Sequence, residues 1–263
     1  MNILEKICQD KKELVETNKK ALPIEKLLFY LEKVNFQKRD FISAIESKIQ
    51  QEQNAIIAEV KKASPSKGII CEHFFPVEMA KNYEKHGASC ISVLTDEKYF
   101  MGCNEFLINI RKNTSLPLLR KDFIIDKYQI WESKMIGADC ILLIMAALSL
   151  EEAQQLEEEA IKAGLDVLVE AHNEAELKQA LKLKSKLIGI NNRNLQDLSV
   201  NIGNAHSMQN LVPKDRILIC ESGINSVNDF ELMNDKGFKS FLIGEFLSKD
   251  AENINKINKF FSK

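Results

Sequence analysis

The sequence lacks any apolar run long enough to cross a membrane as a helix. Its longest apolar stretch, from about Ile141 to Leu150, is much shorter than the roughly 20 residues that a membrane-spanning helix needs. From Glu5 onward the amino terminus alternates in charge and shows no secretory hydrophobic region. The sequence therefore predicts a cytoplasmic protein with no membrane partner.

The sequence also lacks an excess of charge of one sign. Its 263 residues include 36 lysines and arginines and 38 aspartates and glutamates, which gives a formal net charge of −2. Such a balance produces no strong overall field that would attract nucleic acid or an anionic membrane surface. A local basic pocket remains possible.

Cysteines at metal-binding or disulfide spacing are absent. No Cys-x-x-Cys occurs, and the cysteines and histidines form no set of ligands at metal-site spacing; the cysteines stand at Cys8, Cys71, Cys90, Cys103, Cys140 and Cys220. This pattern argues against a zinc site and against a disulfide framework. Cys90, Cys140 and Cys220 lie in or beside apolar runs, where a thiol is expected to be a small buried apolar group.

The four histidines likewise have no nucleophile or metal-ligand partner at a recognisable spacing. His172 closely follows an apolar run and is placed where it could border a pocket. Solvation in a loop is the simpler interpretation of this residue.

Eight short apolar runs are present instead, separated by longer helix-like stretches. They are rich in β-branched residues and bounded by turn residues, a pattern typical of parallel strands joined by crossover helices. The runs are Ile56–Lys61, Ile91–Asp96, Leu118–Asp122, Cys140–Ile144, Val167–Glu170, Leu187–Asn192, Ile217–Ser222 and Phe241–Glu245. Eight such units in a chain of this length predict an α/β protein with a closed (β/α)8 TIM barrel, whose active site lies at the carboxyl ends of the strands.

About fifty residues precede the first of these runs and have helical periodicity. Ile3, Leu4, Ile7, Leu14 and Val15 form one apolar stripe, and a second stripe follows Pro23. We expect residues 1–50 to form a helical extension that packs across one end of the barrel, residues 51–263 to form the barrel itself, and the whole chain to be a single domain. Glycines at 87, 137, 164 and 237 fall shortly before predicted strands, where glycine ends helices in the left-handed conformation.

The first predicted strand ends in two charged side chains. Glu59 and Lys61 are two residues apart, so both point to the same side of a strand, and the polar loop Ser64-Pro65-Ser66-Lys67-Gly68 follows them. A strand-end ion pair beside a solvated loop would explain the lysines, but it does not easily explain Glu59 inside an apolar run. Because burial of charge without a partner is costly, we interpret Glu59 and Lys61 as functional.

The same pattern recurs after two other predicted strands. Lys121 follows Pro117-Leu118-Leu119-Arg120, and Glu170 follows Leu168-Val169. Lysines and glutamates on neighbouring strand ends perturb each other's pKa, which is expected to leave one lysine able to donate a proton and one carboxylate able to accept one near neutral pH. The pattern predicts an acid–base site.

Polar residues and glycines follow the last three predicted strands. Asn191 and Arg193 follow the sixth run, where an amide can fix a hydroxyl and a guanidinium can grip a carboxylate, although Arg193 as a surface residue is a fair alternative. The seventh and eighth runs end in Ser222-Gly223 and Gly244-Glu245, at the positions where many barrels bind phosphate with backbone N–H groups.

These residues closely resemble the indole-3-glycerol-phosphate synthase family. The resemblance extends from Phe41 to about Leu247 in a series of ordered motifs, which is far more specific than any lone motif. The motifs are Ile57-Ala58-Glu59-Val60-Lys61-Lys62-Ala63-Ser64-Pro65-Ser66-Lys67-Gly68, Ser92-Val93-Leu94-Thr95-Asp96, Leu119-Arg120-Lys121-Asp122-Phe123, Leu168-Val169-Glu170, Gly189-Ile190-Asn191-Asn192-Arg193-Asn194-Leu195 and Glu221-Ser222-Gly223-Ile224.

The resemblance implies an enzyme of tryptophan biosynthesis. Its phosphorylated small-molecule substrate would be 1-(2-carboxyphenylamino)-1-deoxyribulose 5-phosphate, which closes an indole ring with loss of carbon dioxide and water. The resemblance implies no metal and no organic cofactor. We expect a monomer or a weak homo-oligomer.

The resemblance also implies roles for individual residues. Lys121 is the general acid, Lys61 and Glu59 assist it, and Glu170 stabilises a cationic intermediate or accepts a proton. Asn191 contacts the sugar-derived hydroxyls, and Arg193 and Ser64 lie near the anthranilate carboxylate. The residues around the phosphate are Ser222, Gly223, Gly244 and Glu245, the last through its backbone N–H.

Two positions depart from the family pattern. Phe246 replaces a small residue beside the phosphate loop, which a backbone-mediated site tolerates if the ring turns into the helix layer. Lys127 replaces a proline and is expected at the surface.

Two other functions fit parts of the pattern. A phosphoribosylanthranilate isomerase would share the last two loops but use a cysteine and an aspartate, without needing Lys61 or Lys121. A noncatalytic barrel would be expected to have lost at least one of the four charged residues, all of which remain.

Overall fold

The computed structural model of the chain describes residues 2–34, 37–194 and 198–248. Parts of the expectations lie outside these residues: 1 and 35–36 of the predicted helical extension, and 195–197 and 249–263 of the predicted barrel segment, with Leu195 of the sixth-strand motif among them.

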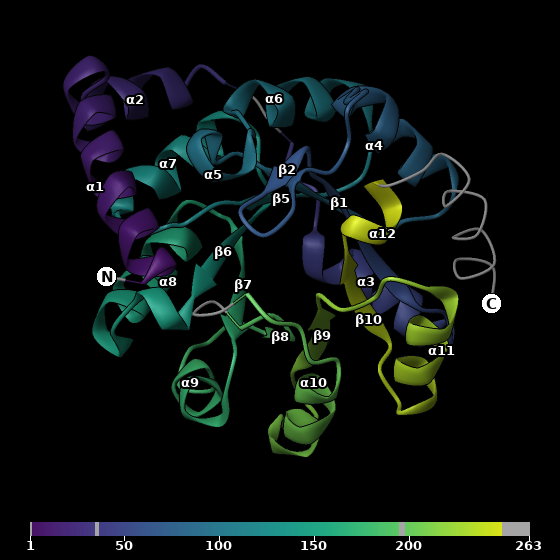
Figure 1. Cartoon of the computed structure of the whole chain (residues 1–263). Coiled ribbons are helices and arrows are strands. Elements are labelled where there is room, and N and C mark those ends of the chain that lie inside the picture. The colour runs from purple at the N-terminus through teal and green to yellow at the C-terminus, as the bar shows by residue number, and fades with distance from the viewer. Residues whose placement is uncertain (1, 35–36, 195–197, 249–263) are drawn as a thin grey trace.

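Eight parallel strands close into a barrel, which confirms the predicted TIM-barrel fold (Figure 1). Around the barrel each strand pairs with its neighbours in the order β1-β10-β9-β8-β7-β6-β5-β4, and β4 pairs with β1 to close the ring. The strands are β1 (Ala55–Val60), β4 (Cys90–Leu94), β5 (Leu118–Lys121), β6 (Cys140–Ile144), β7 (Asp166–Ala171), β8 (Leu187–Asn191), β9 (Ile217–Glu221) and β10 (Ser240–Ile243). Each of the eight predicted runs therefore overlaps a barrel strand.

Helices follow the strands and surround the barrel. They are α4 (Pro76–Lys85), α5 (Glu97–Phe100), α6 (Asn104–Asn113), α7 (Lys127–Met135), α8 (Leu150–Lys162), α9 (Glu174–Ala180), α10 (Gly203–Met208), α11 (Val227–Asp235) and α12 (Glu245–Ser248), with 3-10 turns at Met145–Ala147 and Gln209–Leu211. Ser149 and Asp126 begin α8 and α7 with capping boxes, in which side chain and backbone satisfy each other's free groups. The predicted glycines at 87, 137, 164 and 237 all have positive φ, as expected.

Alternation along each strand divides the core into two layers. Side chains such as Ile57, Leu119 and Leu168 fill the barrel interior, whereas Ile56 and Val169 on the other face pack under the surrounding helices. Successive strand residues point to opposite faces, so every second residue points into the barrel. The last inward-pointing residues of each strand therefore lie at the carboxyl end of the barrel. The cysteines at 90, 140 and 220 are buried, as predicted.

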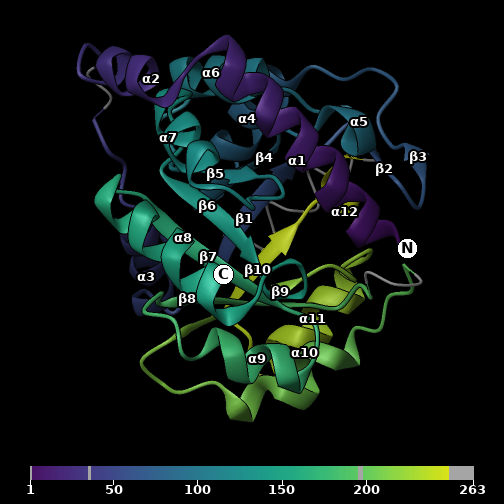
Figure 2. The ribbon, with the colours of Figure 1, turned by 90° about the vertical axis from the view of Figure 1, so that its left-hand side faces the viewer.

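Three helices precede the barrel: α1 (Ile3–Ala21), α2 (Ile24–Leu31) and α3 (Phe41–Gln50). Phe41 and Ile45 of α3 are fully buried in the same cluster as Ala55 and Cys90, at the amino ends of the strands. Figure 2 shows α3 at one end of the barrel and the hairpin of β2 (Ala63–Ser64) and β3 (Gly68–Ile69) at the other, with α1 running along the side between them.

A buried ion pair attaches α1 to the carboxyl end of the barrel. Lys11 Nζ lies 2.7 Å from Asp96 Oδ2 and 2.8 Å from Asp122 Oδ1, just after β4 and β5. Lys11 therefore belongs to the buried stripe of α1 with Ile7 and Val15. Leu14, which was predicted to belong to this stripe, is exposed.

No helix among residues 2–34, 37–194 and 198–248 is both long and apolar enough to cross a bilayer.

Candidate active site

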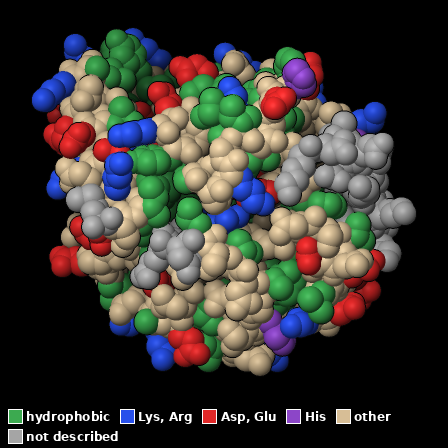
Figure 3. All heavy atoms as spheres, in the orientation of Figure 1, with side chains coloured by type: hydrophobic (Ala, Val, Ile, Leu, Met, Phe, Trp, Pro, Cys, Tyr) green, Lys and Arg blue, Asp and Glu red, His purple; other side chains and the backbone are tan. Residues whose placement is uncertain are grey.

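A pocket opens at the carboxyl ends of the strands, where the inward-pointing charged residues meet. The space-filling view looks onto this face and shows lysine and arginine side chains gathered at a hollow near its centre (Figure 3). The pocket is lined by every site residue that the sequence predicted, namely Glu59, Lys61, Ser64, Lys121, Glu170, Asn191, Arg193, Ser222, Gly223, Gly244 and Glu245. Apolar side chains line it too: Ile3, Leu4 and Ile7 of α1, Phe100, Phe123 and Leu142.

Glu59 and Lys61 form the predicted pair at the end of β1. Lys61 Nζ donates to Glu59 Oε1 at 2.6 Å, and both side chains are largely removed from solvent. Gly244, just after the neighbouring strand β10, leaves room for this pair because it has no side chain: a Cβ there would lie 2.2 Å from Glu59 Oε1 and 3.0 Å from Lys61 Nζ.

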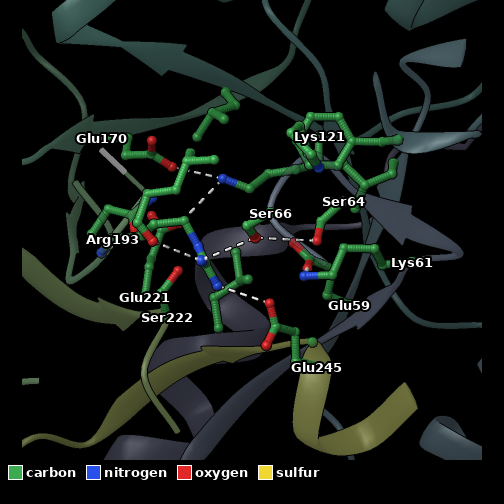
Figure 4. A pocket seen from close by; sticks show the side chains of 18 of the residues that line it. Glu59, Lys61, Ser64, Ser66, Lys121, Glu170, Arg193, Glu221, Ser222 and Glu245 are labelled. Carbon is green, nitrogen blue, oxygen red and sulfur yellow. Dashed lines mark hydrogen bonds and ion pairs between the residues drawn. The ribbon is translucent and has the colours of Figure 1, made fainter. Parts of the chain in front are cut away.

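Lys121 lies between two buried carboxylates (Figure 4). Its Nζ is 2.6 Å from Glu170 Oε2 and 3.2 Å from Glu221 Oε2. Desolvation favours the neutral amine, but the negative charges of Glu170 and Glu221 outweigh it and raise the pKa of Lys121 above its usual value. In the free site Lys121 is therefore an ammonium group, the form of lysine that can donate a proton.

The two carboxylates next to Lys121 have opposite pKa shifts. Burial raises the pKa of Glu170, but Lys121 and His172 outweigh burial, so this pKa is lowered well below its usual range. Burial is also the largest influence on Glu221, and with the added repulsion of Glu170 it raises the pKa of Glu221 to about 8. The site therefore holds one ionised carboxylate and one carboxyl group that is protonated at neutral pH.

Glu221 is a candidate site residue that the sequence interpretation missed, since it lines the pocket and contacts Lys121. It was placed within a motif, but only the following Ser222 and Gly223 were assigned a role. The signal was present, because Glu221 ends an apolar run just as Glu59 does, and the same cost of burying a charge applies to both.

Arg193 is held inside the site and is not a surface residue. Its Nη2 donates to Glu245 Oε1 at 2.8 Å, and its Nη1 donates to Ser66 Oγ at 3.3 Å and to the Leu198 carbonyl at 3.2 Å. Asn191 is buried at the end of β8, and its Oδ1 accepts the backbone N–H of Arg193 at 2.9 Å. The amide thus fixes the turn that directs the guanidinium into the pocket.

The side chain of Glu245 has a role that the sequence did not suggest. It is buried, and its Oε2 accepts a bond from Lys67 Nζ at 2.6 Å while Oε1 accepts the bond from Arg193. Desolvation is outweighed by Lys67, Lys61 and Arg193, so the pKa of Glu245 is lowered and its carboxylate is an anion among cations. It links the first loop to the loops after β8 and β10.

The first loop is a short hairpin in which β2 pairs with β3. Ala63 and Ser64 are buried, whereas Gly68 and Ile69 are exposed. Ser64 Oγ lies 3.4 Å from Ser66 Oγ, the hydroxyl that Arg193 contacts.

Two consecutive left-handed residues follow β9. Ser222 has φ 62° and Gly223 has φ 89°, and both line the pocket beside Gly244. Phe246 is buried in the layer between strands and helices, which is the position that a backbone-mediated phosphate site was expected to tolerate. Lys127 is exposed, as expected.

His172 is not a solvated loop residue, so that interpretation is wrong. Its side chain is 8% exposed and lies between Glu170 and Glu176. His172 is two residues after Glu170, so the alternation of side chains along β7 places both on the same side.

Comparison with known protein families finds a match along nearly the whole chain. The model of the family described as indole-3-glycerol phosphate synthase matches residues 4–260. This match begins before Phe41, so it includes the helices that precede the barrel.

Two relatives with that same name are similar over almost their full length. The protein of Polynucleobacter necessarius subsp. necessarius is 48% identical over 265 aligned residues, covering 99% of both chains. The protein of Azospirillum brasilense is 46% identical over 251 residues, covering 95% of both chains.

Among solved structures, the N-acetylmannosamine-6-phosphate 2-epimerase of Clostridium perfringens is similar with a TM-score of 0.60. Its sequence is 15% identical, and the match covers 87% of this chain and 98% of the epimerase chain. This likeness concerns the fold alone.

Proposed function

The chain belongs to the indole-3-glycerol phosphate synthase family, and we propose that Lys121 and the carboxylates around it carry out the ring closure. The enzyme is a carboxy-lyase of tryptophan biosynthesis: it converts 1-(2-carboxyphenylamino)-1-deoxyribulose 5-phosphate into indole-3-glycerol phosphate, with loss of carbon dioxide and water. The observation that carries the assignment of residues is the position of the Lys121 ammonium between Glu170 and Glu221 inside the pocket.

We propose that Lys121 is the general acid of ring closure. As the aromatic carbon that bears the carboxylate attacks the substrate carbonyl, the carbonyl oxygen gains a proton from Lys121. Loss of carbon dioxide then restores the aromatic ring, and departure of the resulting hydroxyl as water completes the indole. Lys121 is suited to the first step because it is fully protonated in the site.

The surrounding carboxylates have separate proposed roles. Glu170, which is ionised, stabilises the cationic intermediate and accepts a proton during dehydration. Glu221, which is protonated at neutral pH, is a proton donor close enough to Lys121 to restore its charge. Lys61 assists through the charged groups of the substrate, and Glu59 holds or relays a proton beside Lys61.

The substrate's polar groups are assigned to the rim of the pocket. We propose that its phosphate lies at Ser222, Gly223, Gly244 and the backbone N–H of Glu245, that Arg193 and Ser64 face its carboxylate, and that Asn191 contacts its hydroxyls. The left-handed turn at Ser222 and Gly223 supports the phosphate assignment, since both residues line the pocket and successive backbone N–H groups in such turns form anion-binding concavities. Phe123 and Leu142 offer apolar surface to the aromatic ring.

A fluorescence assay tests the proposed function. The purified protein should produce indole fluorescence from the carboxyphenylamino substrate without added metal or cofactor. Activity on phosphoribosylanthranilate instead would indicate an isomerase, and binding without turnover would indicate a noncatalytic barrel.

We also propose that the enzyme is cytoplasmic and is a monomer or a weak homo-oligomer. The support is chemical, because its phosphorylated substrate does not cross membranes freely. We further propose that residues 1–50 and 51–263 fold as a single domain, which is supported by the buried ion pairs of Lys11 with Asp96 and Asp122. Sedimentation across a range of concentrations tests the oligomeric state.

A further inference from the structure

A buried histidine lies directly behind the proposed active-site carboxylate. His172 Nε2 lies 3.2 Å from Glu170 Oε1, and His172 Nδ1 lies 3.0 Å from Glu176 Oε2. The contact with Glu176 is a hydrogen bond, whereas the contact with Glu170 is an ion pair without full hydrogen-bond alignment. The imidazole therefore connects a carboxylate of the pocket to one at the beginning of α9.

The two carboxylates decide the charge of the imidazole. A neutral imidazole has one N–H and one lone pair, so one of its nitrogens would present a lone pair to a carboxylate oxygen. Only the doubly protonated ring is attracted to both oxygens. Burial lowers the pKa of His172, but Glu170 and Glu176 outweigh burial and raise this pKa to about 9, in agreement with the geometry.

Glu176 is itself fixed, so the imidazole is anchored at its far side. Glu176 Oε2 accepts the backbone N–H of His172 at 2.8 Å, and Oε1 accepts the Asn173 side chain at 2.6 Å. Asn173 in turn caps α9 by accepting the backbone N–H of Glu176 at 3.0 Å. Asn204 Nδ2 donates to the His172 carbonyl at 2.9 Å and holds the backbone from the side of α10.

This anchored cation constrains Glu170. One carboxylate oxygen, Oε1, faces His172, and the other, Oε2, accepts a bond from Lys121 at 2.6 Å. Among the residues that the structure describes, the charged groups that face this chain are Lys121 from β5, Glu221 from β9 and Glu176 from α9. The neutral amides of Asn191, Asn192 and Asn204, from the end of β8 and from α10, lie beside His172.

We propose that His172 is a positioning residue for the proposed reaction: as an imidazolium anchored on Glu176, it fixes the Glu170 carboxylate with Oε2 directed at Lys121. This inference rests on the proposed function, since it concerns the carboxylate assigned to the cationic intermediate. His172 does not line the pocket that holds the proposed substrate site, so it acts through Glu170.

Nitrogen NMR of the ligand-free parent protein tests the charge of His172 without any substrate. Its resonance is assigned by its loss in His172→Gln. We expect both ring nitrogens to carry protons at about pH 7, with the ring titrating near pH 9. A neutral ring at pH 7 would overturn the proposal, whether or not the protein proves to be a synthase.

Kinetics of His172→Gln test the positioning itself, with His206→Gln as the matched control because His206 is exposed on α10. We expect kcat to fall roughly tenfold or more, the size of effect that a slightly misplaced group produces, while KM changes less than about twofold. Removal of the cation also raises the pKa of Glu170, so the acidic limb of the pH–rate profile should move to higher pH.

Two further results separate positioning from a purely structural role. His172→Arg restores a cation, so its acidic limb should lie between that of His172→Gln and that of the parent. If His172→Gln lowers the unfolding temperature but keeps the parent's kcat and pH profile, the histidine only stabilises the fold and the proposal is wrong. An inactive parent would refute the proposed function instead, and the NMR result would still stand.

Discussion

Glu221 occupies the barrel interior in the space left by Gly189 on the neighbouring strand. A Cβ atom on Gly189 would lie 2.0 Å from Glu221 Oε1 and 3.3 Å from Leu168 Cδ1. Asn191 pairs with Glu221 in the sheet, and Gly189 is the preceding inward-pointing residue on the strand of Asn191. The glycine thus determines where the carboxyl group next to Lys121 can lie.

Gly189→Ala should displace Glu221 and slow the reaction. The added methyl group has no room unless the Glu221 side chain moves, which breaks its 3.2 Å contact with Lys121. We expect kcat to fall about 10²-fold, within the range for a lost proton-transfer group, with substrate affinity changed far less. Steady-state kinetics and thermal unfolding check this; an unchanged kcat in the folded variant would show that Glu221 is dispensable.

The raised pKa of Glu221 should make folding stability depend on pH. Burial raises this pKa to about 8, above that of an exposed glutamate at about 4.3, so the folded state binds a proton that the unfolded state releases. The stability that Glu221 contributes is fully present below its pKa in the unfolded state and is lost as pH rises through its pKa in the folded state. Glu221→Gln cannot lose this proton. The melting temperature of Glu221→Gln relative to that of the parent should therefore rise between about pH 5 and pH 8, by roughly 2–4 °C for each 1 kcal/mol of relative stability gained. A difference in melting temperature that stays constant with pH would contradict the raised pKa of Glu221.

Gly244 and Gly223 should differ in what a methyl group disturbs. At Gly244 it meets Glu59 Oε1 and Lys61 Nζ, so Gly244→Ala should lower kcat by roughly tenfold or more through the disrupted pair. At Gly223, where φ is +89° and Val200 Cγ1 is 3.3 Å away, it strains the turn assigned to the phosphate and should mainly raise KM. Measured kcat and KM for both variants check this, and equal effects on both parameters in both variants would refute the distinction.

Glu245→Gln should strengthen the binding of anions. The carboxylate neutralises Arg193 and Lys67 in the free site, so an incoming phosphate competes with it. Its removal should tighten competitive inhibition by inorganic phosphate by about fivefold, the equivalent of about 1 kcal/mol. Glu46→Gln, which removes a surface partner of Lys186 at the other end of the barrel, is the matched control. Weaker phosphate inhibition in Glu245→Gln would mean that Glu245 organises the anion site and does not compete for it.

The barrel and most of its site were predictable because their signals are local. Apolar runs with period two specify the strands, and a charged residue at the end of a run reveals itself by the cost of burying it, as for Glu59, Lys121 and Glu170. His172 could have been found in the same way, since it is two residues beyond Glu170 on one side of β7.

Other features depend on contacts between segments far apart in the chain. The helical spacing of Lys11 with Ile7 and Val15 marks a buried stripe, but its partners Asp96 and Asp122 belong to other loops. The partners of the Glu245 side chain could not be predicted, because nothing in the sequence places Lys67 and Arg193 beside it. The direction of the Lys121 pKa shift also required the structure, since it depends on two carboxylates on different strands.

The turnover of Lys121→Met tests the central claim most directly, with Lys127→Met as a control at an exposed lysine. Methionine keeps much of the length of the side chain and removes the ammonium group that lies between Glu170 and Glu221. We expect indole-3-glycerol phosphate to form at least about 10²–10⁴-fold more slowly in single turnover, while the substrate still binds. Formation of the product at nearly the parent's rate would contradict the account and remove Lys121 from the mechanism.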